Sequence, residues 1–346
     1  MKENRNDKFL FYLFVIFSNG EIIMNGSGFI ASGTYGCVHK PPVKCEGNVD
    51  KKKKYYKKTV GKVFRDSSDA EQESTLNDII ATIDPANKWT VQMQKKCFVD
   101  SFDETDEKDA CHFVSSNIQQ YPELIYTYGG IDLNTIMKTD EVSNARRRNI
   151  FIKILKNILP VLEGLRDLNN NKNHHLDIKP ENVLFDGKVL RIVDFGLMDA
   201  RSNIYTKKKM FLLKHNYPYY PPEFKLYAFT STKKTAFSQF EKFIENWNDD
   251  QSFPSNLEQQ YENFYSSIKK KLKSMTQAHV KIEIENYASK IDVYSLGVTL
   301  WQLYKALVWK NNALTTKFEN IINNMTTLNI YTRFDWDEVI NAFKQI

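Results

Sequence analysis

The stretch His175-Leu176-Asp177-Ile178-Lys179-Pro180-Glu181-Asn182 decides the interpretation of this sequence, together with Asp194-Phe195-Gly196 further along the chain. Asp177 can accept a proton from a hydroxyl group, and the amide oxygen of Asn182, five residues later, can hold a metal ion. Asp194 stands seventeen residues after Asp177, beside a flexible glycine, where a carboxylate is a suitable magnesium ligand. Because these groups occur in this order and spacing, the sequence predicts a phosphoryl-transfer centre.

Groups that could hold a triphosphate are also present. The segment Ala31-Ser32-Gly33-Thr34-Tyr35-Gly36-Cys37-Val38 contains two glycines that let a hairpin backbone approach phosphates closely, and Val38 can cover an adenine ring. By itself, a two-glycine hairpin is more often only a turn. Lys179 can neutralise charge on a migrating phosphoryl group.

Lys62 lies in the alternating stretch Val60-Gly61-Lys62-Val63-Phe64, which is typical of a β-strand. We expect its ammonium group to pair with α- and β-phosphate oxygens, provided that a carboxylate from the next helix fixes it. Glu73 is the preferred carboxylate, because apolar residues share its side of the predicted helix, and Glu71 is the alternative. Without the downstream motifs, a surface lysine and a solvated acidic helix start would be the simpler interpretation.

The chain resembles the eukaryotic-type protein kinase family, whose H-R-D-L-K-P-E-N and D-F-G signatures are similar to residues 175–182 and 194–196. The resemblance implies an α+β fold of two lobes, a small β-rich N-lobe with one main helix and a larger, mostly helical C-lobe. It implies ATP and Mg²⁺ as cofactors and a protein hydroxyl as the acceptor. Lys179, two residues after Asp177, resembles the serine/threonine branch.

The resemblance extends from about residue 29 to the C-terminus. Tyr126-Thr127-Tyr128-Gly129-Gly130 resembles the hinge, which implies that backbone groups of Ile125 and Thr127 meet the adenine edge. Asp292-Val293-Tyr294-Ser295-Leu296-Gly297 resembles the helix that anchors the catalytic loop, although an ordinary helix-cap aspartate is nearly compatible with the same residues.

Pro221-Pro222-Glu223 resembles the A-P-E that closes the activation segment, with Arg333 as the ion-pair partner of Glu223. A narrower resemblance links residues 33–45 to serine/threonine kinases of large nucleocytoplasmic DNA viruses, including mimiviruses. The composition, rich in Lys, Asn, Ile and Tyr, is what an AT-rich genome would produce.

Three positions depart from the family pattern. Ala31 replaces the first glycine of the phosphate loop and stiffens it slightly. Leu176 replaces an arginine that usually pairs with a phosphorylated activation segment, so we expect activity without phosphorylation at Ser202, Tyr205 or Thr206. Asn216 replaces a threonine that bridges the catalytic Asp and Lys, which puts catalytic efficiency in doubt.

The hydrophobic pattern predicts β-strands at residues 29–38 and 55–64, a loop at 41–54 between them, and a helix over 66–83. Further strands are expected at 91–97 and 124–128. Downstream, the pattern predicts a long apolar helix over 150–165, a hairpin around Asp186-Gly187, and helices over 293–307 and 336–343. We expect an N-lobe at about 26–128 and a C-lobe at about 129–346. An insertion at about 226–285 is expected to form an extra docked helix or a substrate- or partner-binding surface.

Composition limits the class of protein. With 346 residues, 42% hydrophobic and 26% charged, the chain can bury a large core. The net charge of +6 comes from short separate basic runs, which are typical of solvated surfaces and predict no specific nucleic-acid partner. The four cysteines show neither C-x-x-C pairs nor a His spacing for zinc, so a reduced compartment is the simpler interpretation. Cytoplasmic location follows from ATP use, in a host cytoplasm or a virion if the chain is viral.

Residues 1–25 are an apolar extension of uncertain role. An apolar run over 9–17 follows three basic residues, as in a signal peptide, but is too short to span a bilayer. A docked strand or helix, a frame extension with Met24 as the true start, and a membrane-associated anchor are the other interpretations. Membrane contact is expected only through residues 9–17, and the sequence does not indicate an oligomeric state.

Two rival functions remain open at this point. A pseudokinase scaffold should lack one of the polar groups Lys62, Asp177, Asn182 and Asp194, and this chain keeps all four. A small-molecule phosphotransferase of related fold should lack the Pro-Pro-Glu closure.

Overall fold

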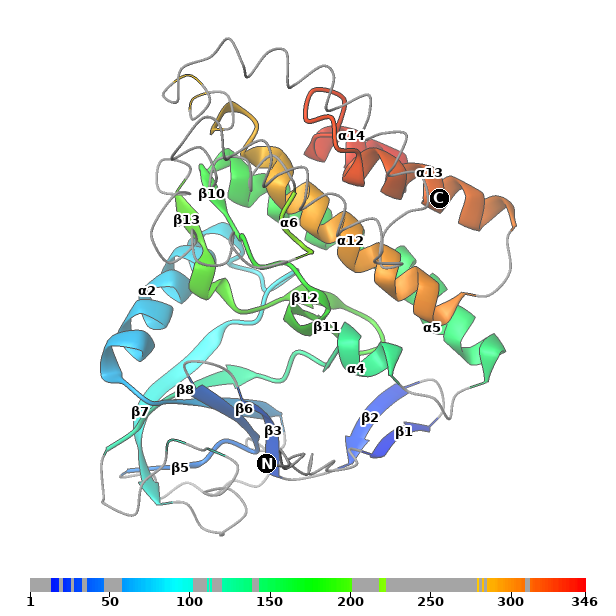
Figure 1. The fold of residues 1–346 in the computed structure, drawn as a ribbon. Helices are drawn as coiled ribbons and strands as arrows, with labels where there is room; N and C mark the ends of the chain where they lie inside the picture. The colour runs from blue at the N-terminus through cyan, green and yellow to red at the C-terminus, as the bar shows by residue number, and fades with distance from the viewer. Residues whose placement is uncertain are drawn as a thin grey trace, which may run out of the picture. The chain divides into compact units, whose positions relative to one another are not determined.

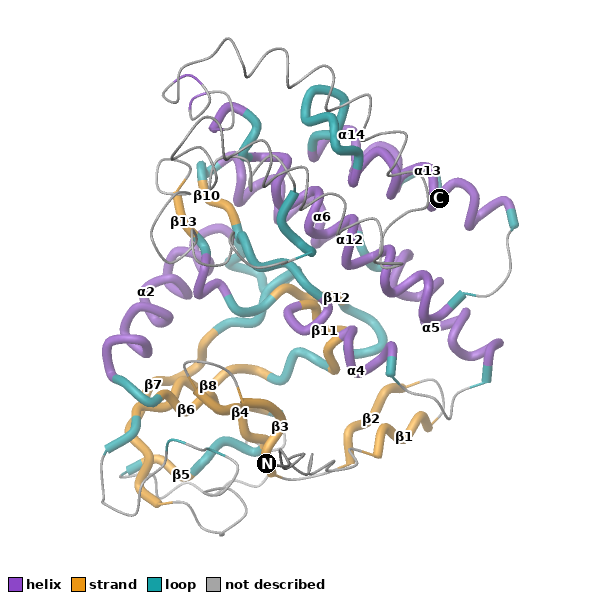
Figure 2. The backbone as a smooth tube through the Cα atoms, viewed as in Figure 1, coloured by secondary structure: helices purple, strands orange, loops and turns teal. Residues whose placement is uncertain are grey.

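The computed structural model describes residues 14–18, 21–25, 28–32, 36–46, 58–101, 111, 113, 120–138, 143–200, 218–221, 279, 282, 285–308 and 312–346. The chain divides into two compact units, one of residues 1–70 with 93–131 and the other of residues 71–92 with 132–346. The first unit is built from strands and the second mostly from helices (Figures 1 and 2). This is the α+β architecture that the sequence predicts.

The first unit contains a six-stranded sheet in the order β3-β4-β6-β8-β7-β5. All neighbouring strands in it are antiparallel. Its strands are β3 (Gly28–Ser32), β4 (Gly36–Lys40), β5 (Lys44–Cys45), β6 (Thr59–Phe64), β7 (Met93–Ser101) and β8 (Pro122–Thr127). The predicted β3–β4 hairpin is confirmed, whereas β5 is a short strand inside a segment predicted to be only a loop.

Strand register divides this sheet into two faces. Val38, Lys62 and Leu124 are direct neighbours across β4, β6 and β8 and therefore share one face, here called the lysine face. Phe64 and Leu124 pack with Ala70 on this side. Because side chains alternate along a strand, Cys37 and Glu123 project from the opposite face.

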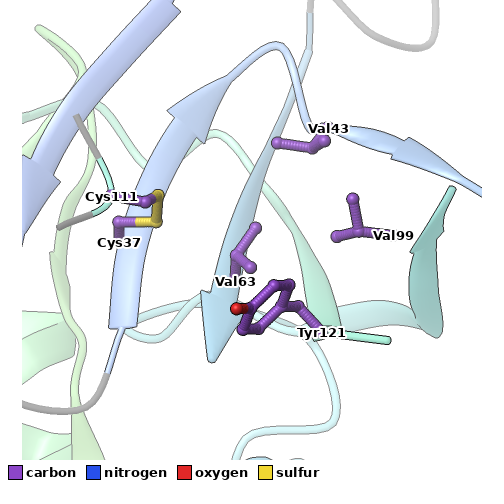
Figure 3. Packing of buried hydrophobic residues seen from close by; sticks show 6 residues of the cluster. All are labelled: Cys37, Val43, Val63, Val99, Cys111 and Tyr121. Carbon is purple, nitrogen blue, oxygen red and sulfur yellow. A yellow bond between two sulfur atoms is a disulfide. The ribbon is translucent and has the colours of Figure 1, made fainter. Parts of the chain in front are cut away.

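The opposite face, here called the cysteine face, carries Cys37, His39, Val63, Cys97 and Glu123. Cys37 is bonded to Cys111 (Figure 3). Cys45 is bonded to Cys97, so all four cysteines of the chain are paired. The expectation of reduced thiols is therefore wrong for this structure. The partners lie 74 and 52 residues apart in sequence, and short cysteine motifs cannot predict pairs at such separations.

A separate antiparallel hairpin is formed by β1 (Phe14–Ser18) and β2 (Glu21–Asn25), within the apolar N-terminal extension. Among the residues that the structure describes, none of the helices has the length and apolar character needed to cross a membrane.

Helix α2 (Ser67–Ile83) agrees with the prediction except at its apolar stripe. Ile80 is buried, but Ile79 remains 39% exposed, so the stripe is narrower than the sequence pattern indicates. Asp84 ends the helix and its carboxylate accepts hydrogen bonds from the backbone amides of Lys88, Trp89 and Thr90. These bonds fix the loop that follows the helix.

The second unit contains helices packed around α12, which is buried along most of its length because apolar residues surround its axis. The helices are α4 (Leu133–Met137), α5 (Asn144–Lys156), α6 (Leu159–Asn170), α12 (Ser289–Leu307), α13 (Ala313–Thr326) and α14 (Trp336–Phe343). Aromatic rings join three of them, with Phe151 and Phe318 centroids 5.1 Å apart and Phe318 and Tyr304 centroids 5.4 Å apart.

The single long helix predicted over 150–165 is wrong. The chain forms α5 and α6 instead, separated at Asn157 and Ile158. Pro160 stands in the first turn of α6, where its missing N–H costs nothing, but it could not donate inside a continuous helix.

Short elements carry the predicted motifs between α6 and α12. They are β10 (Asn173–His174), the 3₁₀ turns η1 (Pro180–Asn182) and η2 (Phe195–Leu197), and the strands β11 (Val183–Phe185), β12 (Leu190–Ile192) and β13 (Asp199–Ala200); β9 (Ile131–Asp132) precedes α4. The predicted hairpin is confirmed, since β11 and β12 pair antiparallel. At its turn Gly187 has φ 96° and Asp186 accepts from the amides of Lys188 and Val189.

Candidate active site

The loop that follows β10 is held by a carboxylate from α12. Asp292 accepts the backbone N–H of His175 at 2.7 Å and that of Leu176 at 2.9 Å. Asp292 is only 3% exposed, so both bonds form away from water, where a carboxylate acceptor contributes most. The carboxylate therefore binds a distant loop, 116 and 117 residues away in sequence.

Leu176 has the backbone conformation that the tight loop requires. Its φ is 62°, in the left-handed region, and its side chain is fully buried. Its carbonyl accepts the hydroxyl of Tyr220 at 2.6 Å. Burial, with the negative charges of Asp177 and Asp292 nearby, raises the pKa of Tyr220 well above its ordinary value, so the hydroxyl remains a donor.

Asp177 is the centre of a small polar network. Lys179 Nζ donates to Asp177 Oδ2 at 2.9 Å, and Asn182 Nδ2 donates to the same oxygen at 2.9 Å and to the Asp177 carbonyl at 2.8 Å. Asp177 is 7% exposed and Asn182 5% exposed. Because Nδ2 makes both bonds of the amide group, Oδ1 is the Asn182 atom that can ligate a metal.

His175 connects this network to the residues before Asp194. Its Nδ1 accepts the N–H of Asp177 at 3.2 Å, which leaves Nε2 to donate to the carbonyl of Val193, also at 3.2 Å. The amide of Val193 in turn donates to the Asn182 carbonyl at 3.0 Å. Asp177, Asn182 and the start of the Asp194 segment thus belong to one hydrogen-bonded unit.

Asp194 itself has φ 63° and directly precedes η2. The following Phe195 is 5% exposed and packs against the ring of His175, with centroids 4.8 Å apart. Asp194 contributes a carboxylate and Asn182 an amide oxygen, and hard oxygen ligands of this kind suit Mg²⁺. The donor set therefore fits the metal that the sequence implies.

Trp89 and Gly164 support the same segment and were not expected from the sequence. The Trp89 ring meets Phe195 edge to face at 6.2 Å, and its carbonyl accepts the N–H of Ile192 at 2.8 Å. A Cβ at Gly164 would overlap the Trp89 indole, so helix α6 needs glycine there. The sequence shows only a break after Asp84-Pro85, which gives no indication that Trp89 reaches this site.

The family model for the protein kinase domain matches residues 30–281, well over half of the sequence. The chain belongs to the protein kinase family. A curated relative, "Probable cyclin-dependent kinase 8" from Dictyostelium discoideum, is 29% identical over 175 residues. That match covers 49% of this chain and 39% of the relative, so the chain spans well under half the length of that protein.

Among the predicted nucleotide-binding residues of the first unit, Val38 and Lys62 lie on the lysine face, whereas Cys37 lies on the cysteine face. Ala31 pairs with Val38 and Ser32 with Cys37 across β3 and β4. Gly36 leaves room for the carbonyl of Val63, which a Cβ would overlap. Gly33, Thr34 and Tyr35, at the tip of the predicted phosphate loop, lie outside the described residues.

Lys62 lies on β6 with Val38 as its neighbour, and its ammonium group is 5.1 Å from the centroid of the Phe64 ring. The strand alternation that the sequence predicts for Lys62 is confirmed. Glu73 is half-buried and Glu71 exposed, which favours Glu73 as the buried carboxylate of α2. Lys62 and Glu73 belong to different compact units, and their pairing remains a prediction.

The two predicted hinge residues differ in their surroundings. Ile125 is 1% exposed and lies inside the sheet, between Gly61 of β6 and Lys95 of β7. Thr127 is the last residue of β8 and is exposed. Contact of the Ile125 and Thr127 backbone groups with an adenine edge remains a prediction.

The predicted activation-segment residues lie largely outside the described residues: Ser202, Tyr205, Thr206, Asn216, Pro222 and Glu223, as does nearly all of the predicted insertion at 226–285. Arg333, the expected partner of Glu223, is 1% exposed. Its Nε donates to the Thr327 carbonyl at 3.0 Å and its guanidinium lies 5.0 Å from the centroid of the Tyr294 ring.

Proposed function

We propose that this chain is an ATP-dependent serine/threonine protein kinase that transfers the γ-phosphoryl group of ATP to a protein hydroxyl. The observation that carries the proposal is the network in which Lys179 and Asn182 both donate to Asp177 Oδ2. Family membership supports it, and the similar Dictyostelium protein is itself named a probable kinase.

Asp177 is the proton acceptor in this proposal. Lys179 and Asn182 both donate to its Oδ2, and these bonds fix the orientation of the carboxylate to which an incoming hydroxyl would donate. The hydroxyl oxygen attacks the γ-phosphorus, the bond from that phosphorus to the β,γ-bridging oxygen breaks, and ADP leaves. The hydroxyl proton goes to Asp177, and general-base assistance of this kind contributes on the order of 10²–10⁴-fold in rate.

Lys179 has a second role as a cation beside the transferred group. Its ammonium lies 2.9 Å from Asp177 Oδ2, so it is held near the point where the substrate hydroxyl must bind. A fixed positive charge there stabilises the extra negative charge of the transition state without reorganising solvent. Its place two residues after Asp177 also supports the serine/threonine assignment.

Asn182 and Asp194 are the residues that would hold Mg²⁺, which neutralises the phosphates when bound. The bonds from Asn182 Nδ2 to Asp177 fix the amide, and the Val193 bonds to His175 and Asn182 fix the backbone before Asp194. Preorganised ligands of this kind lose little conformational entropy on binding. Lys62 and Glu73 would complete the site on the α- and β-phosphates.

We also propose the type of substrate, the cellular location and the origin of the chain. A protein substrate is expected, and a cytoplasmic location, including a host cytoplasm or a virion, follows from the need for ATP. The resemblance of residues 33–45 to kinases of large DNA viruses supports a viral origin.

An assay with labelled ATP, Mg²⁺ and separate basic and acidic test proteins tests the proposal. The wild-type chain should label serine or threonine in at least one test protein, and Asp177→Asn should lose most of the transfer. Asp337→Asn is the matched control, because Asp337 is an exposed partner of Arg166 and far from this network in sequence.

The outcomes separate the rival functions. Nucleotide binding by a well-folded chain with no transfer to any protein would favour a scaffold, and transfer only to small molecules would favour a related phosphotransferase. Either result contradicts the proposed function. Phosphotyrosine as the sole product would contradict the serine/threonine assignment alone.

A further inference from the structure

The cysteine face gathers more metal-binding chemistry than a pair of disulfides requires. Cys37 and His39 stand two residues apart on β4 and therefore project from the same side. Cys111, from the chain between β7 and β8, lies against both. His39 Nε2 is 3.3 Å from Cys37 Sγ and 3.0 Å from Cys111 Sγ. All three residues are 0% exposed.

These three groups have the geometry of one coordination sphere. Their ligand atoms lie within 4.8 Å of one another. Zinc bound to two thiolates and one imidazole holds them at about 2.3 and 2.0 Å, which separates the ligand atoms by roughly 3.5–3.8 Å. The Cα atoms of Cys37 and Cys111 are 5.7 Å apart, so both thiolates can reach one ion by small side-chain rotations.

Apolar neighbours pack with the two cysteines. Val43, Val63, Val99 and Tyr121 pack in the same cluster as the two cysteines (Figure 3). A buried site is stable only if its total charge is small, because desolvating a net charge is costly. Two thiolates, a neutral imidazole and Zn²⁺ sum to zero charge.

A second group on the same face provides a contrast. Cys45 and Cys97 both lie 3.7 Å from Glu123 Oε2. Two thiolates and a carboxylate with Zn²⁺ would leave one net negative charge at a residue, Glu123, that is 0% exposed. Charge balance therefore favours the site with the histidine.

We propose that, in the reduced chain, Cys37, His39 and Cys111 bind one Zn²⁺ ion. Starting from the disulfide, a thiol reductant such as glutathione supplies two electrons and two protons to give two thiols. Zn²⁺ binding then displaces the two thiol protons to solvent. A disulfide oxidant such as oxidised glutathione takes two electrons from the two thiolates and leaves as two thiols, the Cys37–Cys111 disulfide forms again, and the ion is released. The proposal does not depend on kinase activity.

Such a site would restrain β4, the strand that contains part of the predicted phosphate loop. Cys37 is the direct neighbour of Ser32 in β3, and Val38 next to it belongs to the lysine face. The ion would clamp the chain around Cys111 to β4, as the disulfide does in the oxidised chain.

Metal content and ligand chemistry can be measured on the full chain purified anaerobically with a non-chelating reductant. We expect about one Zn²⁺ per chain by elemental analysis, as for a single structural site. Replacing Zn²⁺ by Co²⁺ should give the intense near-ultraviolet absorption of thiolate-to-cobalt charge transfer. Both signals should be lost in Cys37→Ser and in His39→Gln, and a chelator should lower the melting temperature of the wild-type chain alone.

Two further variants test which side chains bind the metal. His39→Cys supplies a third thiolate but also one net negative charge, so it should bind the metal more weakly than the wild type and more strongly than His39→Gln, an order that a purely structural role of the imidazole would not produce. The double variant Cys45→Ser with Cys97→Ser should leave stoichiometry unchanged. A reduced, folded wild-type chain with four titratable thiols and no bound metal would overturn the proposal. Metal that persists in folded His39→Gln, or that disappears only in the Cys45/Cys97 variant, would also overturn it.

Discussion

The predicted catalytic loop of the second unit (residues 175–182) and the cysteine face of the first unit differ in how their polar groups come together. In the loop, Asp177, Lys179 and Asn182 lie within eight consecutive residues and only the anchor, Asp292, is distant. On the cysteine face, Cys37 meets Cys111 across 74 residues of sequence. Local clusters are visible as motifs, whereas clusters built by sheet register are visible only after folding.

This comparison predicts that the distant anchor is the weakest point of the catalytic loop. Asp292→Ala leaves two buried backbone N–H groups without their carboxylate and should cost about 3–5 kcal/mol of unfolding free energy. Phosphoryl transfer should fall on the order of 10²-fold or more as Asp177 shifts. Urea denaturation and steady-state kinetics measure the two effects. Asp292→Asn, which keeps one acceptor oxygen, should be intermediate, and equal stability of all three chains would contradict the anchoring role.

The cysteine face should be equally sensitive to a single methyl group at Gly61. A Cβ there would overlap the carboxylate of Glu123, which accepts the N–H of Val43 at 2.8 Å. Gly61→Ala should therefore destabilise the protein by about 2–4 kcal/mol through overpacking and the loss of that buried bond. Thermal denaturation measures the change. If Gly61→Ala melted with the wild type, the tight approach described here would be incorrect.

A similar contact in the second unit should have a somewhat smaller effect. Gly164→Ala places a methyl group against the Trp89 indole and should cost about 1–3 kcal/mol. Because Trp89 also packs on Phe195, phosphoryl transfer should fall more than stability alone explains. A double-mutant cycle with Trp89→Leu should give a cost below the sum of the single changes. Strict additivity would show that the two residues do not meet.

The β11–β12 turn should give a small pH effect. Burial alone would raise the pKa of Asp186, but hydrogen bonds from Arg191 and from two backbone amides outweigh it and lower the pKa. Stability from this carboxylate is therefore present above the ordinary aspartate value, about 4, and is lost as the pH falls through the lower folded-state pKa. Since the side chain is partly exposed, the contribution should be under about 1 kcal/mol.

Denaturation at pH 7 and pH 3 tests this expectation. Asp186→Asn should reduce the stability difference between the two pH values. A pH dependence that is identical in wild type and Asp186→Asn would contradict the assignment.

The smallest effect is expected at the predicted phosphorylation positions. Leu176 is fully buried and replaces the cation that would pair with a phosphate in related kinases. Alanine or glutamate at Ser202, Tyr205 or Thr206 should therefore change turnover by less than about twofold, as for ordinary surface substitutions. Turnover measured on chains treated with phosphatase gives an independent check. A large response in either measurement would show that another cation performs this role.

Much of the fold was predictable where periodicity or turn chemistry acts locally. The β3–β4 and β11–β12 hairpins, helix α2 and helix α14 follow directly from glycine positions and apolar spacing. The prediction of one helix over 150–165 was wrong because it followed the continuous apolar pattern and neglected Pro160, which stands at the start of a second helix. Trp89 and Gly164 were missed because a small residue in a helix gives no indication of which side chain approaches it.

By itself, the sequence determined the order and chemical identity of the proposed phosphoryl-transfer groups, because Asp177, Lys179 and Asn182 lie within a few residues of one another. Tertiary structure alone decided that Asp292 would bind the loop amides, that Trp89 would reach Phe195, and that His39 would meet both sulfurs of a cysteine pair. The reason is physical: local chain geometry fixes neighbours a few residues apart, but strand register and helix packing select distant ones. Those choices depend on the whole buried core, which no short stretch of sequence contains.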